Sequence, residues 1–311
     1  YDKEVEKPTL TIKSGVMTMT SNFDVEGSHY SWSETAVGDA VMDGKWSLRA
    51  TKLIKDQERR IASTLKNYRH YCKASPSWSV DWESLRDEIE VALLDTSTAG
   101  FYGQCQKPLI DLTKICKEGG AEQVAAQVKS YQCSFAKKGS QPSLALSKGK
   151  MNLTAAWEHK ELWAYIDKQV GASIRVGAFN WPDNKYIKHE EELIQYSLAR
   201  MNTMCDFEIK TTIDWESFKP ILAPLAETTT YGVAGACDDV IQRLSHVCGS
   251  GRKKEVQKAV ESLSCQYSPK DKIGMSMKKK DIVFSTSLKV DSSYDSIDKV
   301  LIKRKIMKKS R

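Results

Sequence analysis

Asp81-Trp82-Glu83-Ser84 occurs a second time in this chain, as Asp214-Trp215-Glu216-Ser217. Four cysteines flank each copy at nearly the same spacing. Steps of 33, 11 and 17 residues separate Cys72, Cys105, Cys116 and Cys133, and steps of 32, 11 and 17 separate Cys205, Cys237, Cys248 and Cys265. All eight cysteines of the chain belong to these two sets. The sequence therefore predicts a tandem duplication, with residues 1–140 as the first repeat domain and residues 141–311 as the second.

The cysteines indicate the compartment. An even number of cysteines at matching positions is typical of a disulfide framework in an exported protein. Zinc is the alternative, but the sequence has no Cys-x-x-Cys pair, and its five histidines do not fall at matching positions in the two copies. We therefore predict disulfides, no metal site and no cofactor, in a periplasmic or extracellular protein. Because the chain begins at Tyr1, we expect a signal peptide to have been removed.

Helix length restricts how the cysteines pair. Cys105 and Cys116 would be about 16 Å apart on one continuous helix, whereas a disulfide needs Cα atoms within about 7 Å. Two antiparallel helices, 105–116 and 121–131, would return Cys133 to Cys105 and leave Cys116 at the turn. We favour Cys105–Cys133 with Cys72–Cys116, and Cys237–Cys265 with Cys205–Cys248. The alternative is Cys72–Cys105 with Cys116–Cys133, repeated in the second set.

Three stretches predict β-hairpins, because apolar residues alternate with polar ones on both sides of a turn. They turn at Ser14-Gly15, at Lys148-Gly149 and near Lys279-Lys280. The chain then reads hairpin, module, hairpin, module, hairpin. In this order the second hairpin would complete the sheet of the first domain, and the third hairpin would complete the sheet of the second.

Apolar residues at helical spacing predict a long helix at the start of each module, over residues 54–72 and 187–205. A second helix begins near Cys105 or Cys237 and ends near Cys116 or Cys248, and a last helix covers residues 121–131 and 253–263. Strand-like alternation at residues 46–50 and 173–176 adds strands to each domain. The predicted fold class is α+β, with a hairpin-based sheet and three to four helices per domain.

The motifs that suggest chemistry each have a structural alternative. Asp81 and Glu83 could act as an acid–base pair, but an Asp followed by a Glu also begins a helix, and the repetition of the motif favours this second interpretation. Glycines 100 and 103, and 232 and 235, could cradle an anion, although close packing is favoured because no Gly-Lys-Ser/Thr follows. His189 lacks a second histidine four residues later and is expected on an exposed helix face.

The net charge of +7 comes from the end of the chain. Residues 299–311 hold seven basic residues and no acidic one, so the rest of the chain is balanced at 40 of each. A nucleic-acid partner is therefore not favoured. The mixed apolar and basic residues here predict a final strand with a basic outer face. The alternative is an anionic-surface anchor that uses Lys303, Arg304 and Lys305.

The two copies differ most at residues 25–53 and 159–186, which are rich in aromatic residues. We predict binding residues in these segments, namely His29, Tyr30, Trp32, Trp46, Trp163 and Trp181. The expected function is non-enzymatic binding of a protein or an envelope polymer, in the cell envelope. One alternative is a hydrolase of an envelope polymer that uses carboxylates of the same segments, namely Asp39, Asp43, Glu158, Glu161 and Asp183. Another is a structural or secretion-apparatus component. No apolar run approaches the roughly 20 residues of a membrane span.

Overall fold

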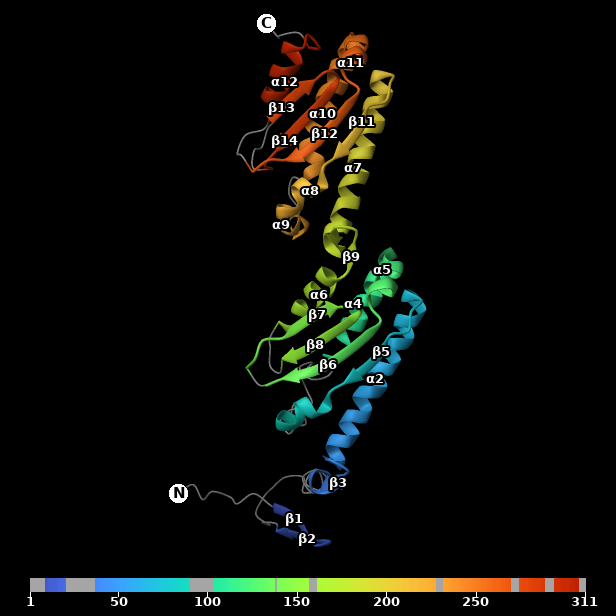
Figure 1. Cartoon of the computed structure of the whole chain (residues 1–311), viewed down its shortest axis with the longest axis vertical. Helices are drawn as coiled ribbons and strands as arrows, with labels where there is room; N and C mark the ends of the chain where they lie inside the picture. Colours follow the sequence, from blue (N-terminus) through green and yellow to red (C-terminus); the bar gives the residue numbers. More distant parts are fainter. Residues whose placement is uncertain are drawn as a thin grey trace, which may run out of the picture. The chain divides into compact units, whose positions relative to one another are not determined.

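The computed structural model describes residues 9–20, 37–89, 103–137, 139–156, 161–227, 232–269, 274–288 and 294–307 (Figure 1). The chain divides into two compact units, residues 1–174 (unit 1) and 175–311 (unit 2). Both units combine helices and strands, so the α+β prediction is confirmed. The boundary predicted between residues 140 and 141 separates two sequence repeats, not two compact units. It stays a prediction, as does the duplication itself.

Apart from β1 and β2 in unit 1 and η3 and α9 in unit 2, the described elements of the two units follow the same order. Those of unit 1 are β1 (Thr9–Lys13), β2 (Val16–Thr20), β3 (Met42–Asp43), β4 (Trp46–Ser47), α2 (Leu48–Cys72), β5 (Ser77–Val80), η1 (Trp82–Glu88), α4 (Lys107–Ile115), η2 (Cys116–Gly120), α5 (Ala121–Gln127), β6 (Ser130–Ala136), β7 (Ser143–Ser147), β8 (Lys150–Ala156) and α6 (Leu162–Ser173). Those of unit 2 are β9 (Arg175–Val176), β10 (Phe179–Asn180), α7 (Trp181–Cys205), β11 (Lys210–Ile213), α8 (Trp215–Phe218), η3 (Lys219–Ile221), α9 (Leu222–Glu227), α10 (Val233–Val247), η4 (Cys248–Arg252), α11 (Lys253–Ala259), β12 (Ser262–Tyr267), β13 (Gly274–Lys278), β14 (Asp281–Thr286) and α12 (Tyr294–Lys303).

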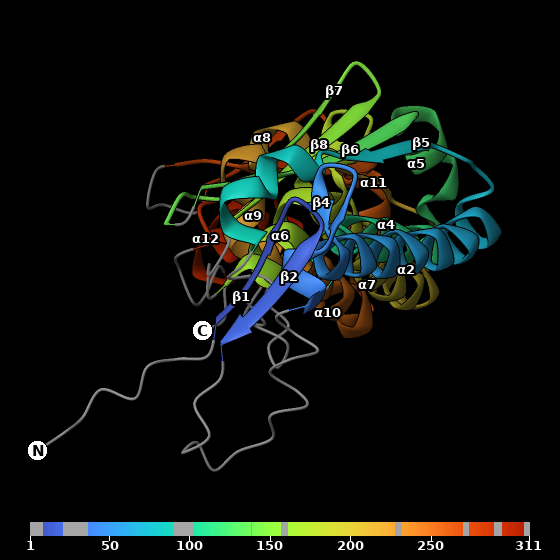
Figure 2. The same ribbon diagram turned by 90° about the horizontal axis from the view of Figure 1, so that it is seen from below.

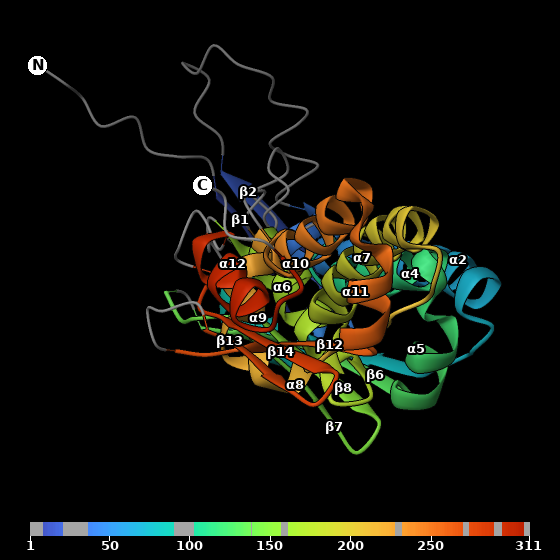
Figure 3. The ribbon, with the colours of Figure 1, turned by 90° about the horizontal axis from the view of Figure 1, so that it is seen from above.

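Each unit contains one four-stranded sheet, in the order β5-β6-β8-β7 or β11-β12-β14-β13. The first three strands of each order are parallel, and the last one is antiparallel to its neighbour. Helices α2 and α4 lie on one side of the first sheet (Figure 2), and α7, α10 and α12 lie on one side of the second (Figure 3). All three predicted hairpins are present. β7–β8 completes the sheet of unit 1 and β13–β14 completes that of unit 2, as the order of the elements predicted.

The predicted long helices are confirmed but begin earlier than expected. Ser47 caps α2, since its side chain accepts a 3.1 Å hydrogen bond from the Ala50 amide. The strand predicted over residues 46–50 is therefore wrong beyond Ser47. The strand predicted from Ser173 is also short, because α6 occupies residues 162–173 and buries Ile166 and Val170, four residues apart on one face.

The central strands β6 and β12 replace the ends of the last predicted helices. α5 ends at Gln127 and α11 at Ala259. Beyond them the burial alternates: Tyr131, Cys133 and Phe135 face the helices, and the residues between them are half-buried. The helices predicted over 121–131 and 253–263 are therefore wrong in their last turns, because the buried residues there follow a period of two.

Four disulfides join the helices to one another and to the sheets. Cys72 is bonded to Cys116 and Cys205 to Cys248, with Cα atoms 5.1 Å apart in both cases. Cys105 is bonded to Cys133 and Cys237 to Cys265, at 5.7 and 6.1 Å. This is the pairing that the helix lengths favoured. Gly119 and Gly251 allow the turns after the middle helices, since their φ angles of 96° and 87° favour glycine.

The first residues of the basic segment, 299–303, lie in a helix. In α12, Ile297 and Leu301 lie four residues apart and are fully buried against the rest of unit 2. The predicted final strand is therefore wrong, because this spacing places both side chains on one helix face.

The repeated Asp-Trp-Glu-Ser segment has the same structure in both units. Asp81 accepts a hydrogen bond from the Ser84 amide (3.4 Å), and Asp214 accepts one from the Ser217 amide (3.3 Å). The hydroxyl oxygens of these serines accept hydrogen bonds from the backbone amides of Phe135 and Tyr267, both at 2.8 Å. Each segment therefore begins a helix and fastens it to the central strand, which confirms the structural interpretation.

Candidate functional site

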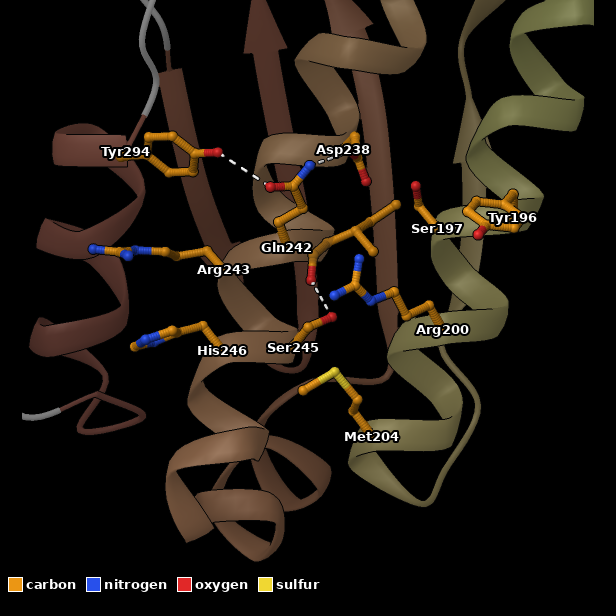
Figure 4. Close-up of a pocket in the computed structure, with 11 residues that line it drawn as sticks. Tyr196, Ser197, Arg200, Met204, Asp238, Gln242, Arg243, Ser245, His246 and Tyr294 are labelled. Atoms are coloured by element: carbon orange, nitrogen blue, oxygen red, sulfur yellow. Dashed lines mark hydrogen bonds between the residues drawn. The ribbon is translucent and has the colours of Figure 1, made fainter.

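A groove of about 510 Å³ lies over α10 in unit 2, between α7 and α12 (Figure 4). Its lining comes from three helices that are far apart in the sequence. The lining residues that Figure 4 labels are Tyr196, Ser197, Arg200, Met204, Asp238, Gln242, Arg243, Ser245, His246 and Tyr294. The volume falls within the range of ligand sites in proteins.

One wall of the groove is held by an ion pair. Arg243 donates two hydrogen bonds to the carboxylate of Asp298, and its guanidinium carbon lies 5.5 Å from the centre of the Tyr294 ring. The bonds to Asp298 raise the pKa of Arg243 above its ordinary value. Arg243 therefore helps to hold α12 against α10. Because Asp298 balances its positive charge, Arg243 contributes little net charge to the groove.

The floor of the groove carries a chain of polar contacts. Gln242 donates to Asp238 Oδ2 at 2.5 Å, and its carbonyl oxygen accepts from the Tyr294 hydroxyl at 3.3 Å (Figure 4). Asp238 Oδ1 is buried and has no hydrogen-bond partner among the described residues. A buried acceptor without a partner is unfavourable, so this oxygen is the polar atom of the groove floor that would gain most from a new hydrogen bond.

The opposite wall presents a free cation between apolar side chains. Tyr196, Arg200 and Met204 follow one another at four-residue steps on α7, and Tyr196 is 76% exposed. Within the described part of the chain, Arg200 forms no ion pair and no hydrogen bond to another side chain. The groove therefore combines a cation, an acceptor and two tyrosines.

Unit 1 does not reproduce this arrangement. Counted from the cysteines that the two units share, Arg200 corresponds to Asn67 and Asp238 to Gln106. Gln106 donates a 3.0 Å hydrogen bond to Thr64, so that α2 and α4 are bridged at the place where the groove lies in unit 2. The cation and the acceptor therefore belong to unit 2 alone.

A second hollow, of about 740 Å³, lies between α7 and the edge strand β11. Its charged side chains are of both signs, namely Lys188, Glu191 and Glu192. Glu191 is already used, because it accepts a hydrogen bond from Trp215. We therefore take the groove over α10 as the candidate site.

The aromatic residues predicted to bind a ligand have structural roles where they are described. Arg86 lies 5.1 Å from the centre of the Trp46 ring, and Trp181 is buried at the start of α7. Trp163 packs against Gly103, where an added Cβ would lie 3.0 Å from the indole ring. This contact supports the close-packing interpretation of that glycine. His29, Tyr30 and Trp32 lie outside the described residues.

The three basic residues predicted for an anionic surface lie at the end of α12. Lys303, Arg304 and Lys305 are exposed. Arg304 donates to the carbonyl oxygen of Met277, and the carbonyl of Lys305 accepts a 3.0 Å bond from Arg252. These contacts fasten the segment to unit 2, and contact with an anionic surface stays a prediction.

The carboxylates named for a hydrolase belong to both units. Asp39 pairs with Arg49 at 3.2 Å and Asp43 with Lys55 at 3.6 Å, both in unit 1. Asp183 is buried in the first turn of α7 in unit 2, and this burial raises its pKa. Glu158 lies outside the described residues, and Glu161 directly precedes α6. Glu83 is also occupied, since the bond from Arg86 lowers its pKa.

The residues of the groove were not among those predicted from the sequence. The sequence carried one signal for them, the difference between the two cysteine sets: Arg200 and Asp238 stand where the first set has Asn67 and Gln106. Among the described residues, no group of three or more His, Cys, Asp or Glu side chains is arranged to bind a metal ion. No described helix has the length and hydropathy needed to cross a membrane.

No protein-family model, curated protein or solved structure matches this chain.

Proposed function

We propose that the chain is an exported, non-enzymatic interaction protein of the cell envelope, which binds an acidic peptide segment of a protein partner in the groove over α10. The observation that carries the proposal is Arg200, a cation without a partner among the described residues, which lines the same groove as Asp238, whose Oδ1 also has no partner. Four disulfides support the export, because such bonds persist in oxidising compartments.

The lining favours a peptide over a glycan or a phosphate polymer. Tyrosine, arginine and methionine are enriched in protein interfaces, and all three occur here, as Tyr196, Arg200 and Met204. A peptide offers both groups that the groove lacks: a carboxylate for Arg200, and a backbone N–H for Asp238 Oδ1. A phosphate polymer offers an anion for Arg200 but no N–H group for Asp238 Oδ1.

The test uses the full chain and an array of synthetic 12-residue peptides that combine Asp or Glu with aromatic residues. Peptidoglycan fragments and lipopolysaccharide form the comparison arm. We expect a subset of acidic peptides to bind, and Arg200→Glu to weaken this binding by at least about tenfold, because the charge that recognises the ligand is reversed. Raised salt should weaken it as well.

Asn67→Glu is the matched control, because it introduces the same charge at the corresponding exposed position of unit 1. It should leave peptide binding unchanged. Binding of the glycans alone, or peptide binding that responds equally to both substitutions, would overturn the assignment of the groove.

A further inference from the structure

The hairpin β1–β2 has the same register and turn as the hairpins that close the two sheets. Its first and last paired residues are Thr9 and Thr20, and the corresponding pairs are Ser143 with Thr154 and Gly274 with Ser285. The first turn residue has a positive φ in all three: 49° at Ser14, 48° at Lys148 and 55° at Lys279. The three hairpins are therefore copies of one structural element.

Two of the copies bury an apolar face that the third exposes. Met151 and Leu153 of β8 are 0% and 1% exposed, and Ile282 and Phe284 of β14 are both fully buried. Met17 and Met19 occupy the same positions in β2 and are 52% and 53% exposed. An apolar face of this kind marks a surface that another element covers.

The backbone of β2 also lacks a partner that its counterparts have. β8 pairs in parallel with β6, and β14 pairs in parallel with β12. Among the described strands, β2 pairs with β1 alone. An unpaired strand edge beside an exposed apolar face is suited to join another sheet.

We propose that β1–β2 closes the sheet of a third α/β unit, built like units 1 and 2 and encoded before Tyr1 in a longer polypeptide. Neither sheet of this chain needs the hairpin, because β7–β8 and β13–β14 already hold the equivalent places. The other two copies show what covers such a hairpin: a helical layer on its apolar face and a parallel strand along its free edge.

The spacing along the chain places this unit upstream. Ser143 follows the last residue of β6 by seven positions, and Gly274 follows the last residue of β12 by seven. These central strands are seven and six residues long. A partner strand of that length, ending seven positions before Thr9, would begin before Tyr1.

The first test exchanges hairpins within the full chain, replacing residues 143–154 by the sequence of residues 9–20. If β1–β2 is built for such a sheet, the exchanged protein keeps the Cys105–Cys133 bond and melts within about 5 °C of the original. The control carries Met17→Ser and Met19→Ser in the transplanted hairpin and should melt far lower. Equal melting of the exchanged protein and its control would overturn the equivalence.

The second test identifies the occupant by hydrogen exchange at the amides of Met17 and Met19, which face the free edge of β2 because the amides of the alternate residues bond to β1. These amides should exchange rapidly in the 311-residue protein. In the polypeptide purified from its natural source they should be protected by at least about 100-fold, and terminal sequencing should show an added four-cysteine segment. A natural polypeptide of 35.0 kDa with rapid exchange would overturn the proposal. Protection that appears in the 311-residue protein as its concentration rises would overturn the upstream source in favour of a second copy.

Discussion

Trp215 Nε1 donates a 2.9 Å hydrogen bond to Glu191 Oε1, and the same bond recurs in the other unit between Trp82 and Glu58 at 3.1 Å. In each pair the two residues are 24 positions apart. The bond joins the repeated Asp-Trp-Glu-Ser segment to the long helix that precedes it. In both units, the motif is thus fastened to the long helix by the same hydrogen bond.

Replacing Trp215 by Phe should therefore destabilise unit 2. The substitution removes a hydrogen bond to a charged acceptor and part of a nearly buried ring, so we expect a loss of about 2–3 kcal/mol in the free energy of unfolding. Urea denaturation followed by circular dichroism measures it. Glu191→Gln keeps an acceptor and should lose less; a larger loss for the glutamine variant would contradict this account.

Asp111 should make the stability of unit 1 depend on pH. Burial raises the pKa of Asp111 from 3.8 to about 6, and Asp167 adds to this rise, although Lys107 acts in the opposite direction. The carboxyl thus binds its proton more tightly in the folded chain than in the unfolded chain. This group therefore makes the folded state more stable as the pH falls from about 6 to about 4, and less stable as it rises again.

Asp111→Asn removes this dependence. The denaturation midpoint of the variant, relative to the original protein, should rise between pH 4 and pH 7. A constant difference between the two proteins across this range would show that Asp111 does not titrate as described.

Two buried tyrosines should respond oppositely to loss of the hydroxyl. Tyr68 is fully buried, its hydroxyl has no partner among the described residues, and burial raises its pKa to about 12. Tyr131 is equally buried but donates a 2.8 Å bond to the carbonyl oxygen of Cys105. We expect Tyr68→Phe to leave stability unchanged or raise it, and Tyr131→Phe to lower it by about 1 kcal/mol. Thermal unfolding of the two variants measures this difference. Equal losses of stability would be inconsistent with the difference in hydrogen bonding.

Gly232 should tolerate no side chain. A Cβ there would lie 2.5 Å from Glu190 Oε2, the atom that accepts a 2.6 Å bond from the amide of Ala234 at the start of α10. Gly232→Ala should therefore displace the carboxylate and destabilise unit 2 by about 1–3 kcal/mol. Gly249→Ala is the control, because its Cβ would meet only the flexible end of Met204, at 3.1 Å. Chemical denaturation of both variants should give the larger loss at position 232.

The disulfides should differ in their contribution to stability according to the loops that they close. Cys72 and Cys116 are 44 positions apart, and Cys105 and Cys133 are 28 apart. Replacing the first pair by alanine should cost about 4 kcal/mol in the chain-entropy account, and the second pair slightly less. Guanidinium unfolding of the two double variants tests the order, and a clearly larger loss for the shorter loop would contradict it.

Much of the fold was predictable where one local rule determines the structure. The strict alternation around Met17 and Met151, with a turn between the strands, specifies a hairpin without reference to the rest of the chain. The length of a helix was sufficient to separate Cys105 from Cys116. The central strands were missed because Tyr131 and Cys133 lie shortly after a helix. Two apolar residues alone fit the 3.6-residue period of a helix as well as the two-residue period of a strand. The helix α12 was missed because Val300, Leu301 and Ile302 resemble a strand until the burial of Ile297 is known.

The groove could not be predicted, since its residues come together only after three helices have packed. Arg200, Asp238 and Tyr294 form no pattern with their neighbours on their own helices that would mark a site. Their proximity depends on Ile194, Val240 and Ile297, which bury the opposite faces of those helices in one core. No spacing rule within a single helix contains that information.

The interleaved disulfides also limit how far each unit can be stretched. From Cys72 to Cys133 the steps of 33, 11 and 17 add to 61 residues, a contour of roughly 200 Å when extended. The bonds offer a shorter covalent route, from Cys72 to Cys116, back along eleven residues to Cys105, and across to Cys133. That route extends to only about 50 Å. A tensile load on the chain would therefore leave most of the contour between Cys72 and Cys133 slack, and this oxidised segment would act as a short, nearly inextensible link.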